Sequence, residues 1–353
     1  MAKIVFLSFY SGIVERGVEN FTSEVAKRLQ GKHQITILQA GKPKTNKFRT
    51  IQIKTFASLP KSSKGLLGKL YLDWPSIKIL IFTTRIIPKI LKLKPDVIIP
   101  LNGGWQTLIA RLFTKLIGAK IIISGHAGIG SDDAFNLLFR PDVFIALTIA
   151  EAKWAKRLTP EVKIVIIPNG VDLARFNPKV DAKSISLAKP IVVCSSALVP
   201  YKRVDLTIRA VAKTGMSLLL LGDGEMRGTI DSLGKRVLGA KYLRLVVPYF
   251  DIPAYYRAGK VFTLASKTEA FGISYIEAMA CNLPVVTTSD DSRSEIVGDA
   301  GILTDPTNFD QYAKDLKLAA GSNYRNKPYA QALNFSWNKI AQKYSDLITE
   351  LPK

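Results

Sequence analysis

Short apolar runs alternate with amphipathic stretches along most of the chain. In the first half, nearly continuous Val, Ile and Leu runs predict strands at Ile4–Phe9, Gln34–Leu38, Asp96–Ile99, Lys120–Ser124, Val143–Leu147 and Lys163–Ile167. Between them, apolar positions at helical spacing predict helices such as Val18–Leu29 and Gln106–Leu116. Strands without polar alternation are covered on both faces, which indicates a parallel sheet in a doubly wound α/β domain.

The same rhythm restarts after residues 177–190, a polar segment with two prolines and no clear period. We therefore expect two Rossmann-like domains, residues 1–176 and 177–330, that face an interdomain cleft. Ligands of such sheets bind beyond the carboxyl ends of the strands. A terminal amphipathic helix is predicted at Phe335–Leu351. The strands predicted in the second half are Ile191–Ser195, Ser217–Leu221, Leu243–Val246, Val261–Leu264 and Val285–Thr287.

Two glutamates stand eight positions apart in the stretch KTEAFGISYIEAMA, residues 267–280. Glu269 falls in the loop after a predicted strand, and Glu277 falls in the helix that follows. Backbone N–H groups near Gly272 then form a helix N-terminus, which favours a phosphate group. The pair suits an acid and a base, or acceptors for sugar hydroxyls. A helix-capping Glu269 and a solvated Glu277 explain the spacing equally well.

Further candidates follow other strand ends of the second half. Lys202 and Arg203 lie in LVPYKRVDL, where an ammonium and a planar guanidinium suit a diphosphate. Gly222 and Asp223 form the turn in LLGDGE. A solvated basic turn and an ordinary strand-to-helix turn are the alternatives. No G-x-G-x-x-G follows a predicted strand, so the sequence lacks the dinucleotide-binding fingerprint.

The first half offers fewer candidates. Gly12 and Gly17 follow the first predicted strand, where a residue without a side chain lets the backbone approach a ligand, although glycine is also a common turn former. His126 enters a glycine-bearing loop after a strand and suits a contact with a substrate hydroxyl, although a lone histidine also serves structure. No cluster of His, Cys and Asp at ligand spacing accompanies it, so we expect no metal site.

Several motifs occur in a characteristic order. These are RGVENF with Glu19, GKHQITIL, His126 after a strand, PNGVDLARFNP at 168–178, LVPYKRVD, LGDGE, and TEAFGISYIEAMACNLPVVTT with its two glutamates. In this order they resemble the family 4 retaining glycosyltransferases of the GT-B fold. The resemblance extends from residue 1 to about 345 and is strongest over residues 165–305.

The resemblance implies transfer of a sugar from a nucleotide diphosphosugar to an acceptor with net retention at the anomeric carbon, without a metal or another cofactor. Lys202 would neutralise the donor diphosphate, Glu269 would bind hydroxyls of the donor sugar, and His126 would contact the sugar from the opposing domain. Glu277 would accept hydrogen bonds from the ribose. The implied donor-binding residues are Gly17, Arg203, Gly222, Asp223, Ala270, Phe271, Gly272, Ile273 and Glu277.

The same resemblance assigns the acceptor side to residues 1–176 and nucleotide-sugar binding to residues 177–330. It implies that residues 331–353 return to the N-terminal domain. One departure concerns a usual phosphate-binding arginine, because this chain has Ala197 at that position. Arg203 stands where a glycine often follows the lysine, and our hypothesis is that it compensates. In the first glycine loop, Arg16 and Gly17 replace a frequent pair of glycines.

The net charge of +22 points to an anionic partner or surface. Between Lys42 and Lys94 stand thirteen Lys or Arg residues and a single acid, Asp73, so +12 falls within 53 residues. Residues 64–94 mix apolar side chains with lysines at near-helical spacing, which suits a helix on an anionic membrane. A domain helix with a solvated basic face is the alternative. Pro75 and Pro88 argue against one straight helix.

No uncharged apolar run reaches the roughly 18 residues of a membrane span, and the start lacks a charged signal-peptide region. Cys194 and Cys281 lie in apolar patterns, so we expect no disulfide and a cytoplasmic location. Together with the basic segment, this predicts a peripheral location at the inner face of the membrane.

The expected function is transfer of a hexose, mannose or glucose, from a nucleotide-sugar donor to a glycan or lipid-linked acceptor in surface polysaccharide or glycolipid synthesis. The alternatives are a GT-B sugar-nucleotide epimerase and a non-catalytic basic binder of membrane or nucleic acid. No nucleic-acid motif appears in the sequence, so we expect no nucleic-acid partner.

Overall fold

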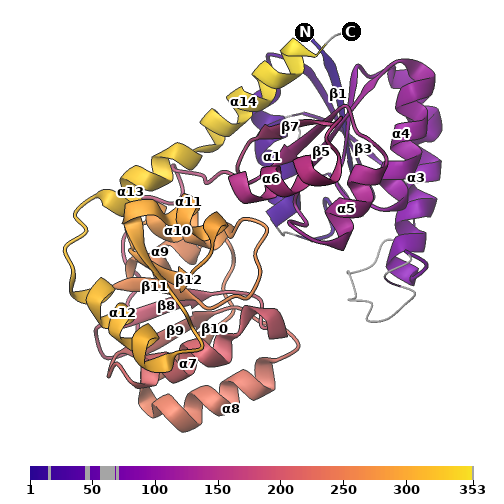
Figure 1. Ribbon diagram of the computed structural model, residues 1–353. Helices are drawn as coiled ribbons and strands as arrows, with labels where there is room; N and C mark the ends of the chain where they lie inside the picture. Colours follow the sequence, from indigo (N-terminus) through magenta and orange to yellow (C-terminus); the bar gives the residue numbers. More distant parts are fainter. Residues whose placement is uncertain (15–16, 44–47, 56–67, 69–70, 352–353) are drawn as a thin grey trace. The chain divides into compact units, whose positions relative to one another are not determined.

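The computed structural model describes residues 1–14, 17–43, 48–55, 68 and 71–351, and the chain divides into two compact units (Figure 1). Unit 1 comprises residues 1–169 and 337–353, and unit 2 comprises residues 170–336. The boundary expected after residue 176 is therefore corrected to residue 169. The reason is local packing: Val171 N donates to Phe335 O at 2.8 Å, and the Phe176 ring lies 5.7 Å from the Tyr249 ring.

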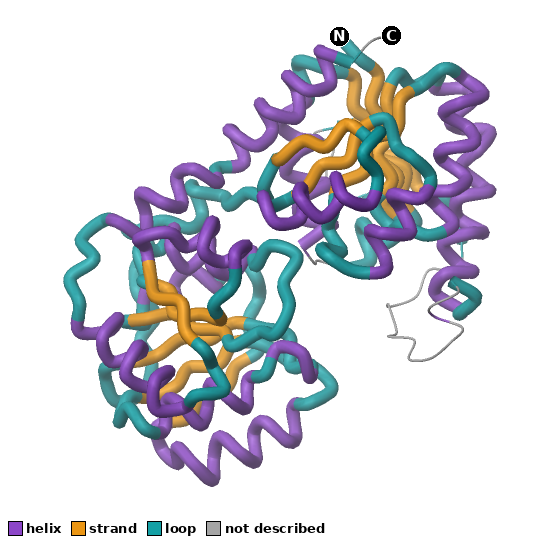
Figure 2. Tube along the Cα trace, in the orientation of Figure 1, coloured by secondary structure: helices purple, strands orange, loops and turns teal. Residues whose placement is uncertain are grey.

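Unit 1 is built on a parallel sheet, whose strands are orange in Figure 2. Their order is β3-β2-β1-β4-β5-β6-β7. Its strands are β1 (Lys3–Ser8), β2 (Gln34–Gln39), β3 (Arg49–Gln52), β4 (Val97–Pro100), β5 (Lys120–Ser124), β6 (Val143–Ala146) and β7 (Lys163–Ile166). Its helices are α1 (Gly17–Leu29), α3 (Trp74–Leu93), α4 (Trp105–Ile117), α5 (Ser131–Leu138), α6 (Ile149–Leu158) and α14 (Trp337–Glu350).

Both faces of this sheet are buried. Along β1, Ile4 and Phe6 join the apolar cluster that contains residues of α1 and α14, whereas Val5 and Leu7 join the cluster that contains residues of α3 and α4. Successive side chains of a strand point to opposite faces, so a strand covered on both faces needs apolar residues at every position. This is why the strands read as continuous apolar runs.

Helix α3 begins only at Trp74, so it does not extend over the whole of residues 64–94, and it continues through Pro88. Pro75 lies in the first turn, where a missing N–H breaks no intrahelical bond, and Asp73 accepts from the N–H of Ser76 as the N-cap. Pro88 removes the usual partner of the Thr84 carbonyl, but both residues are exposed, so water can solvate that carbonyl.

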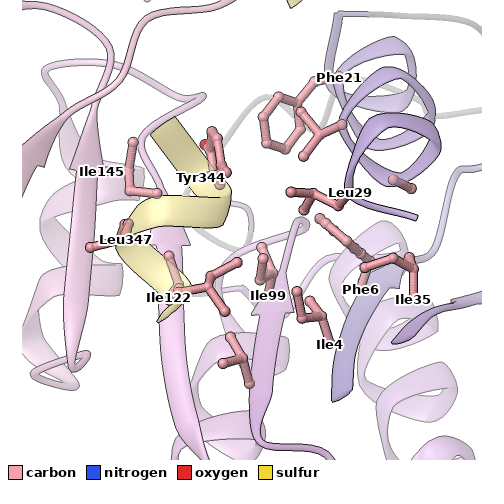
Figure 3. Packing of buried hydrophobic residues seen from close by; sticks show 14 of the residues in the cluster. Ile4, Phe6, Phe21, Leu29, Ile35, Ile99, Ile122, Ile145, Tyr344 and Leu347 are labelled. Atoms are coloured by element: carbon pink, nitrogen blue, oxygen red, sulfur yellow. The ribbon is translucent and has the colours of Figure 1, made fainter. Parts of the chain in front are cut away.

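Helix α14 contributes to the core of unit 1 (Figure 3). Trp337, Tyr344 and Leu347 are buried in one cluster with Phe21 of α1, and the rings of Phe21 and Tyr344 lie 5.5 Å apart. The Tyr344 hydroxyl is 3.0 Å from Ser124 Oγ at the end of β5. Residues 331–336 belong to unit 2, so the return to unit 1 begins at Trp337 rather than at residue 331.

Unit 2 repeats the architecture with the strand order β10-β9-β8-β11-β12-β13, again parallel. The strands are β8 (Ile191–Ser195), β9 (Ser217–Leu221), β10 (Tyr242–Leu245), β11 (Val261–Leu264), β12 (Val285–Thr288) and β13 (Gly301–Thr304). The helices are α7 (Val204–Ala212), α8 (Arg227–Leu238), α9 (Ile252–Arg257), α10 (Ile273–Ala280), α11 (Asp291–Val297), α12 (Phe309–Gly321) and α13 (Lys327–Ala332). The predicted class of two doubly wound α/β domains is confirmed.

Candidate functional site

In unit 2, the strand order changes direction between β8 and β11. At such a switch point the loops that leave the two strands run to opposite sides, and ligands of open α/β sheets bind beyond the carboxyl ends of the strands there. The loop after β8 carries Lys202, and the loop after β11 carries Glu269. The structure therefore brings the two residues, which are distant in sequence, to one edge of the sheet.

Lys202 Nζ lies 2.6 Å from Glu269 Oε1. Their side chains are only 14% and 12% exposed, so Lys202 is not the solvated lysine of an ordinary basic turn. The two loops are also joined through the backbone, because Lys267 N donates to Tyr201 O at 2.8 Å. The site thus holds one cation suited to a phosphate oxygen and one carboxylate suited to hydroxyl donors, both fixed by their mutual contact.

Arg203 has a backbone φ of 48°, in the left-handed region that favours glycine. Its Nε donates to Ala265 O at 2.7 Å, and its Nη2 donates to Thr288 Oγ1 at 3.3 Å. The guanidinium therefore joins the carboxyl ends of β11 and β12 to the lysine loop. Two of the N–H groups of the guanidinium, those of Nε and Nη2, thus hold the lysine loop in place.

The turn after β9 packs against the loop after β8. A Cβ at Gly222 would lie 1.9 Å from the backbone oxygen of Ser196, so only glycine fits this approach. Asp223 O accepts from Leu198 N at 2.9 Å, while the Asp223 side chain is half exposed. Arg244 Nη1 donates to Gly222 O at 3.0 Å and braces the turn from β10.

Helix α10 begins at this edge, and its N-cap residue is a glycine, which has no side chain to cap the helix. Gly272, the N-cap, has a φ of 86°, and a Cβ there would lie 2.3 Å from the ring of Tyr275. Phe271 is buried, and Ala270 and Ile273 flank the turn. Because the helix dipole leaves partial positive charge on the first-turn amides, this turn suits an anion.

Glu277 is 5% exposed, so the alternative of a solvated glutamate is wrong. The Tyr249 hydroxyl donates to Glu277 Oε1 at 2.5 Å, and the Arg175 guanidinium lies 5.2 Å from the centre of the Tyr249 ring. Burial raises the pKa of Glu277 to about 7, although the Tyr249 hydrogen bond and the Arg175 charge act in the opposite direction. Neither Tyr249 nor Arg175 was predicted from the sequence, although Arg175 lies inside the motif PNGVDLARFNP.

A second arginine absent from the sequence prediction supports the Glu269 loop. Arg293 is 2% exposed and forms an ion pair with Asp290, the N-cap of α11. Its Nη2 donates to Ser266 O at 2.9 Å, and its Nε donates to the Tyr275 hydroxyl at 3.2 Å. The sequence signal was an aspartate three positions before an arginine at a helix start, which occurs on many solvated helices.

The candidates from the first half, His126, Gly12 and Gly17, lie in unit 1. The His126 ring is buried against Phe21, with ring centres 4.4 Å apart. Burial lowers the pKa of His126 to about 4, so the ring is neutral at pH 7. Within the described part of the chain, no group forms a hydrogen bond with His126 Nε2. Gly17 is the first residue of α1, directly after residues 15–16, which lie outside the described residues.

Two buried carboxyl groups flank the His126 loop and gave no signal in the sequence. Asp133 accepts from two successive backbone N–H groups, those of residues 127–128, and burial raises its pKa to about 6. Glu151 accepts from Leu147 N at 2.6 Å, and burial raises its pKa to about 8. Glu151 is therefore mostly protonated at neutral pH.

Among the residues that the structure describes, no three His, Cys, Asp or Glu side chains come together as ligands for a metal ion. A reaction without a metal or cofactor stays a prediction. Cys194 and Cys281 are buried free thiols. None of the described helices has the length and apolar character to cross a bilayer.

Two family models match the chain. The model described as Glycosyltransferase Family 4 matches residues 16–175, and the model described as Glycosyl transferases group 1 matches residues 176–333.

Curated proteins with similar sequences include mannosyltransferases. The GDP-mannose-dependent alpha-(1-6)-phosphatidylinositol monomannoside mannosyltransferase of Mycolicibacterium smegmatis is 26% identical over 227 residues, which are 56% of this chain and 59% of that protein. The O-antigen chain mannosyltransferase B of Escherichia coli is 38% identical over 96 residues, 26% of this chain and 25% of that protein. The chain thus matches less than two thirds of the length of these relatives.

Solved structures match nearly the whole chain. Sucrose-phosphate synthase from Thermosynechococcus elongatus has a TM-score of 0.83 at 18% identity and covers 99% of both chains. Anabaena HepE, in complex with UDP and glucose, has a TM-score of 0.76 at 18% identity and covers 99% of this chain and 100% of that chain. At these identities the likeness concerns the fold, and it confirms the predicted GT-B architecture.

Proposed function

We propose that this chain, which belongs to the family 4 glycosyltransferases, moves a hexosyl group from a nucleotide diphosphosugar to a glycan or lipid-linked acceptor with retention of anomeric configuration. The observation that carries the proposal is the pair Lys202 and Glu269 at the switch point of unit 2. Glu269 lies on the loop that leads into helix α10, whose N-cap is Gly272. This arrangement offers a cation, a helix N-terminus and a carboxylate to one ligand.

The cation and the helix N-terminus suit the donor diphosphate. Lys202 supplies a point charge for a phosphate oxygen, and the amides around Phe271–Gly272 supply fixed dipoles that need no reorganisation when the leaving diphosphate gains charge. Arg203 adds to the positive potential while it anchors the loop. These groups stabilise the leaving group without a metal ion, so we propose a reaction that requires none.

The two glutamates have separate tasks in this proposal, because their partners differ. Glu269 pairs with Lys202 and would accept from hydroxyls of the donor sugar. Glu277 would accept from the ribose hydroxyls, with the Tyr249 hydroxyl fixing its carboxyl group in place. In unit 1, we propose that the neutral His126 contacts a sugar hydroxyl.

Donor identity is the first question for experiment. Mannose from a GDP donor is the first candidate, because two relatives are named as mannosyltransferases, and glucose from a UDP donor is the second, because HepE is described with UDP and glucose. Epimerase activity and non-catalytic binding are not favoured by these names.

A thermal-shift panel of GDP-, UDP- and ADP-sugars would test the proposal on the wild type and on Glu277→Ala. A donor at about 100-fold excess over its Kd should add about 2.7 kcal/mol to the free energy of unfolding. The variant should lose this gain, whereas Glu295→Ala, which changes an exposed glutamate on α11, should keep it. If none of the three nucleotide series stabilises the wild type, the proposed donor site is wrong.

We also propose that the protein works at the inner, cytoplasmic face of an anionic membrane. Helix α3 packs on the sheet through Phe82, Ile86 and Ile90, so it is a helix of the domain, as the alternative reading had it. Outside that stripe, Trp74 is 59% exposed and Leu91 is 45% exposed.

Exposed apolar side chains among lysines are the composition of a surface that enters the headgroup layer. The residues from Lys42 to Lys94 supply the positive charge, and parts of this segment, residues 44–47, 56–67 and 69–70, lie outside the described residues. Attraction of about 1 kcal/mol per basic residue near an anionic surface would hold the protein there without a membrane-spanning helix.

A further inference from the structure

A pocket of about 310 Å³ opens at the end of the unit 2 sheet where β11 and β12 begin. Its walls come from the end of α9, the turn after α10, and the end of α12 with the loop that follows. Its lining includes Arg257, Lys260, Asn282, Asn323 and Arg325. All strands of this sheet are parallel, so the pocket and the Glu269 loop lie at opposite ends of β11. A four-residue strand separates them by about 13 Å.

The charge of this pocket is one-sided. Arg257, Lys260 and Arg325 contribute three cations, and none of the lining residues is a carboxylate. Among the described residues, none of the three cations forms an ion pair with an acid within 4.0 Å. Arg257 Nε is buried and has no hydrogen-bond partner in the described chain. A partly buried cationic group without an ion-pair partner is costly, and an anionic ligand beside the group offsets that cost.

The negative C-terminal ends of three helices offset part of this positive charge, but not all of it. The C-termini of α9, α10 and α12 meet at the pocket, and each carries roughly half a negative charge. Arg257 Nη1 donates to Cys281 O at 3.0 Å, so one of the three cations is engaged with the end of α10. About −1.5 from three helix ends leaves an excess of about +1.5 from the three side chains.

The backbone holds the walls of the pocket in a defined shape. Asn282 Nδ2 donates to Arg325 O at 2.8 Å, and Asn323 Oδ1 accepts from Arg325 N at 3.0 Å. Both Asn282 and Arg325 have left-handed backbone conformations, with φ of 62° and 51°. These bonds place the base of the Arg325 side chain beside the turn that follows α10.

We propose that this pocket binds the phosphate group of a small phosphomonoester, such as a hexose phosphate, at a site separate from the switch point. The volume is at the low end for ligand pockets, which suits a sugar phosphate better than a nucleotide sugar. A dianionic phosphate balances the excess positive charge. The Arg257 guanidinium and the Lys260 ammonium then play the roles that such groups have in phosphate sites. The inference does not depend on the proposed transferase activity.

Isothermal titration calorimetry of the full chain with glucose 6-phosphate, at physiological salt, would test this site. The variant Lys260→Gln with Arg325→Asn removes two cations; asparagine tolerates the left-handed conformation of residue 325, and Arg257 keeps its bond to Cys281. The loss of two charged hydrogen bonds should weaken binding about tenfold or more. Far-UV circular dichroism would confirm that the variant is folded.

Matched controls separate the pocket from general attraction to a basic protein. Lys235→Gln with Arg236→Gln removes the same charge from the exposed face of α8 and should leave the affinity unchanged. Lys202→Gln, at the switch point, should also leave it unchanged. The proposal would be overturned if the wild type and the pocket variant bound glucose 6-phosphate with equal affinity. It would also be overturned if Lys202→Gln were the only variant that abolished binding.

A lipid phosphate has the same chemistry as a free phosphomonoester, so a second arm distinguishes the two sources. Phosphatidylcholine vesicles with and without phosphatidic acid would be sedimented with the pocket variant and with the α8 control. We expect the two variants to bind these vesicles equally, which supports a free ester as the ligand. Vesicle binding that fails only in the pocket variant, with no heat from glucose 6-phosphate on the wild type, would overturn the proposal in favour of a lipid headgroup.

Discussion

The free energy of unfolding of the wild type should fall as the pH rises, because Glu277 is buried. The variant Glu277→Gln should not show this fall. Burial raises the pKa of Glu277 from 4.5 to about 7 in the folded protein. A carboxyl group with a raised folded-state pKa contributes its full stability below pH 4.5 and loses it as the pH rises through 7, because the unfolded chain ionises first. Since one pKa unit corresponds to 1.36 kcal/mol, the complete loss is about 3 kcal/mol.

Urea unfolding between about pH 5 and pH 8 would measure this effect. All four tryptophans belong to unit 1, so tryptophan fluorescence follows unit 1, while far-UV circular dichroism follows both units. Relative to Glu277→Gln, the wild type should lose stability in the circular dichroism transition as the pH rises. The fluorescence transition should show the same pH dependence in both proteins. Glu295→Gln, at an exposed position, should behave as the wild type.

Parallel pH profiles of the wild type and Glu277→Gln would refute the argument, because the burial of Glu277 would then not change its protonation. A wild type that gains stability relative to the variant as the pH rises would also refute it. That result would mean that the Tyr249 hydroxyl and the Arg175 charge outweigh burial. Asp133 and Glu151 have raised pKa values as well, but both belong to unit 1 and are present in every variant.

Two further changes test the packing of the lysine loop and the membrane surface. Gly222→Ala should cost about 2–3 kcal/mol in urea unfolding, because its Cβ meets a backbone oxygen; Gly239→Ala, also at positive φ but in open space, should cost about 1 kcal/mol. Trp74→Ser should weaken sedimentation with anionic vesicles about tenfold, because about half of a large apolar side chain no longer enters the bilayer surface. Leu318→Ser, which changes an exposed leucine of unit 2, should have no effect, and an equal loss in both would contradict the placement of the surface on α3.

The sequence predicts the buried strands well, because covering both faces of a parallel sheet requires apolar residues at consecutive positions. It does not reveal β3 and β13, which lie at sheet edges and are only partly buried. Their sequences RTIQ and GILT are short and carry polar or glycine residues. The continuity of α3 through Pro88 is also hidden, because it depends on the exposure of that face of the helix.

Positions after strand ends are what the sequence predicts for the site, and Lys202 and Glu269 lie together there. Residues that contact the site only because of tertiary packing cannot be predicted from positions after strand ends. Tyr249 reaches Glu277 across 28 positions, and Arg293 reaches the carbonyl of Ser266 across 27. Neither spacing corresponds to a strand or helix period, so local patterns cannot indicate these contacts.

The return of the chain to unit 1 at Trp337 sets an order for folding during synthesis. Residues 170–336 leave the ribosome before α14 does, and their two ends are already joined by the bond from Val171 N to Phe335 O. Residues 1–169 of unit 1 are therefore translated first, and their apolar surface around Phe21 stays exposed to solvent while unit 2 is synthesised and folds. A chain released before Trp337 would expose that surface permanently and present chaperones and proteases with a mark of incomplete translation.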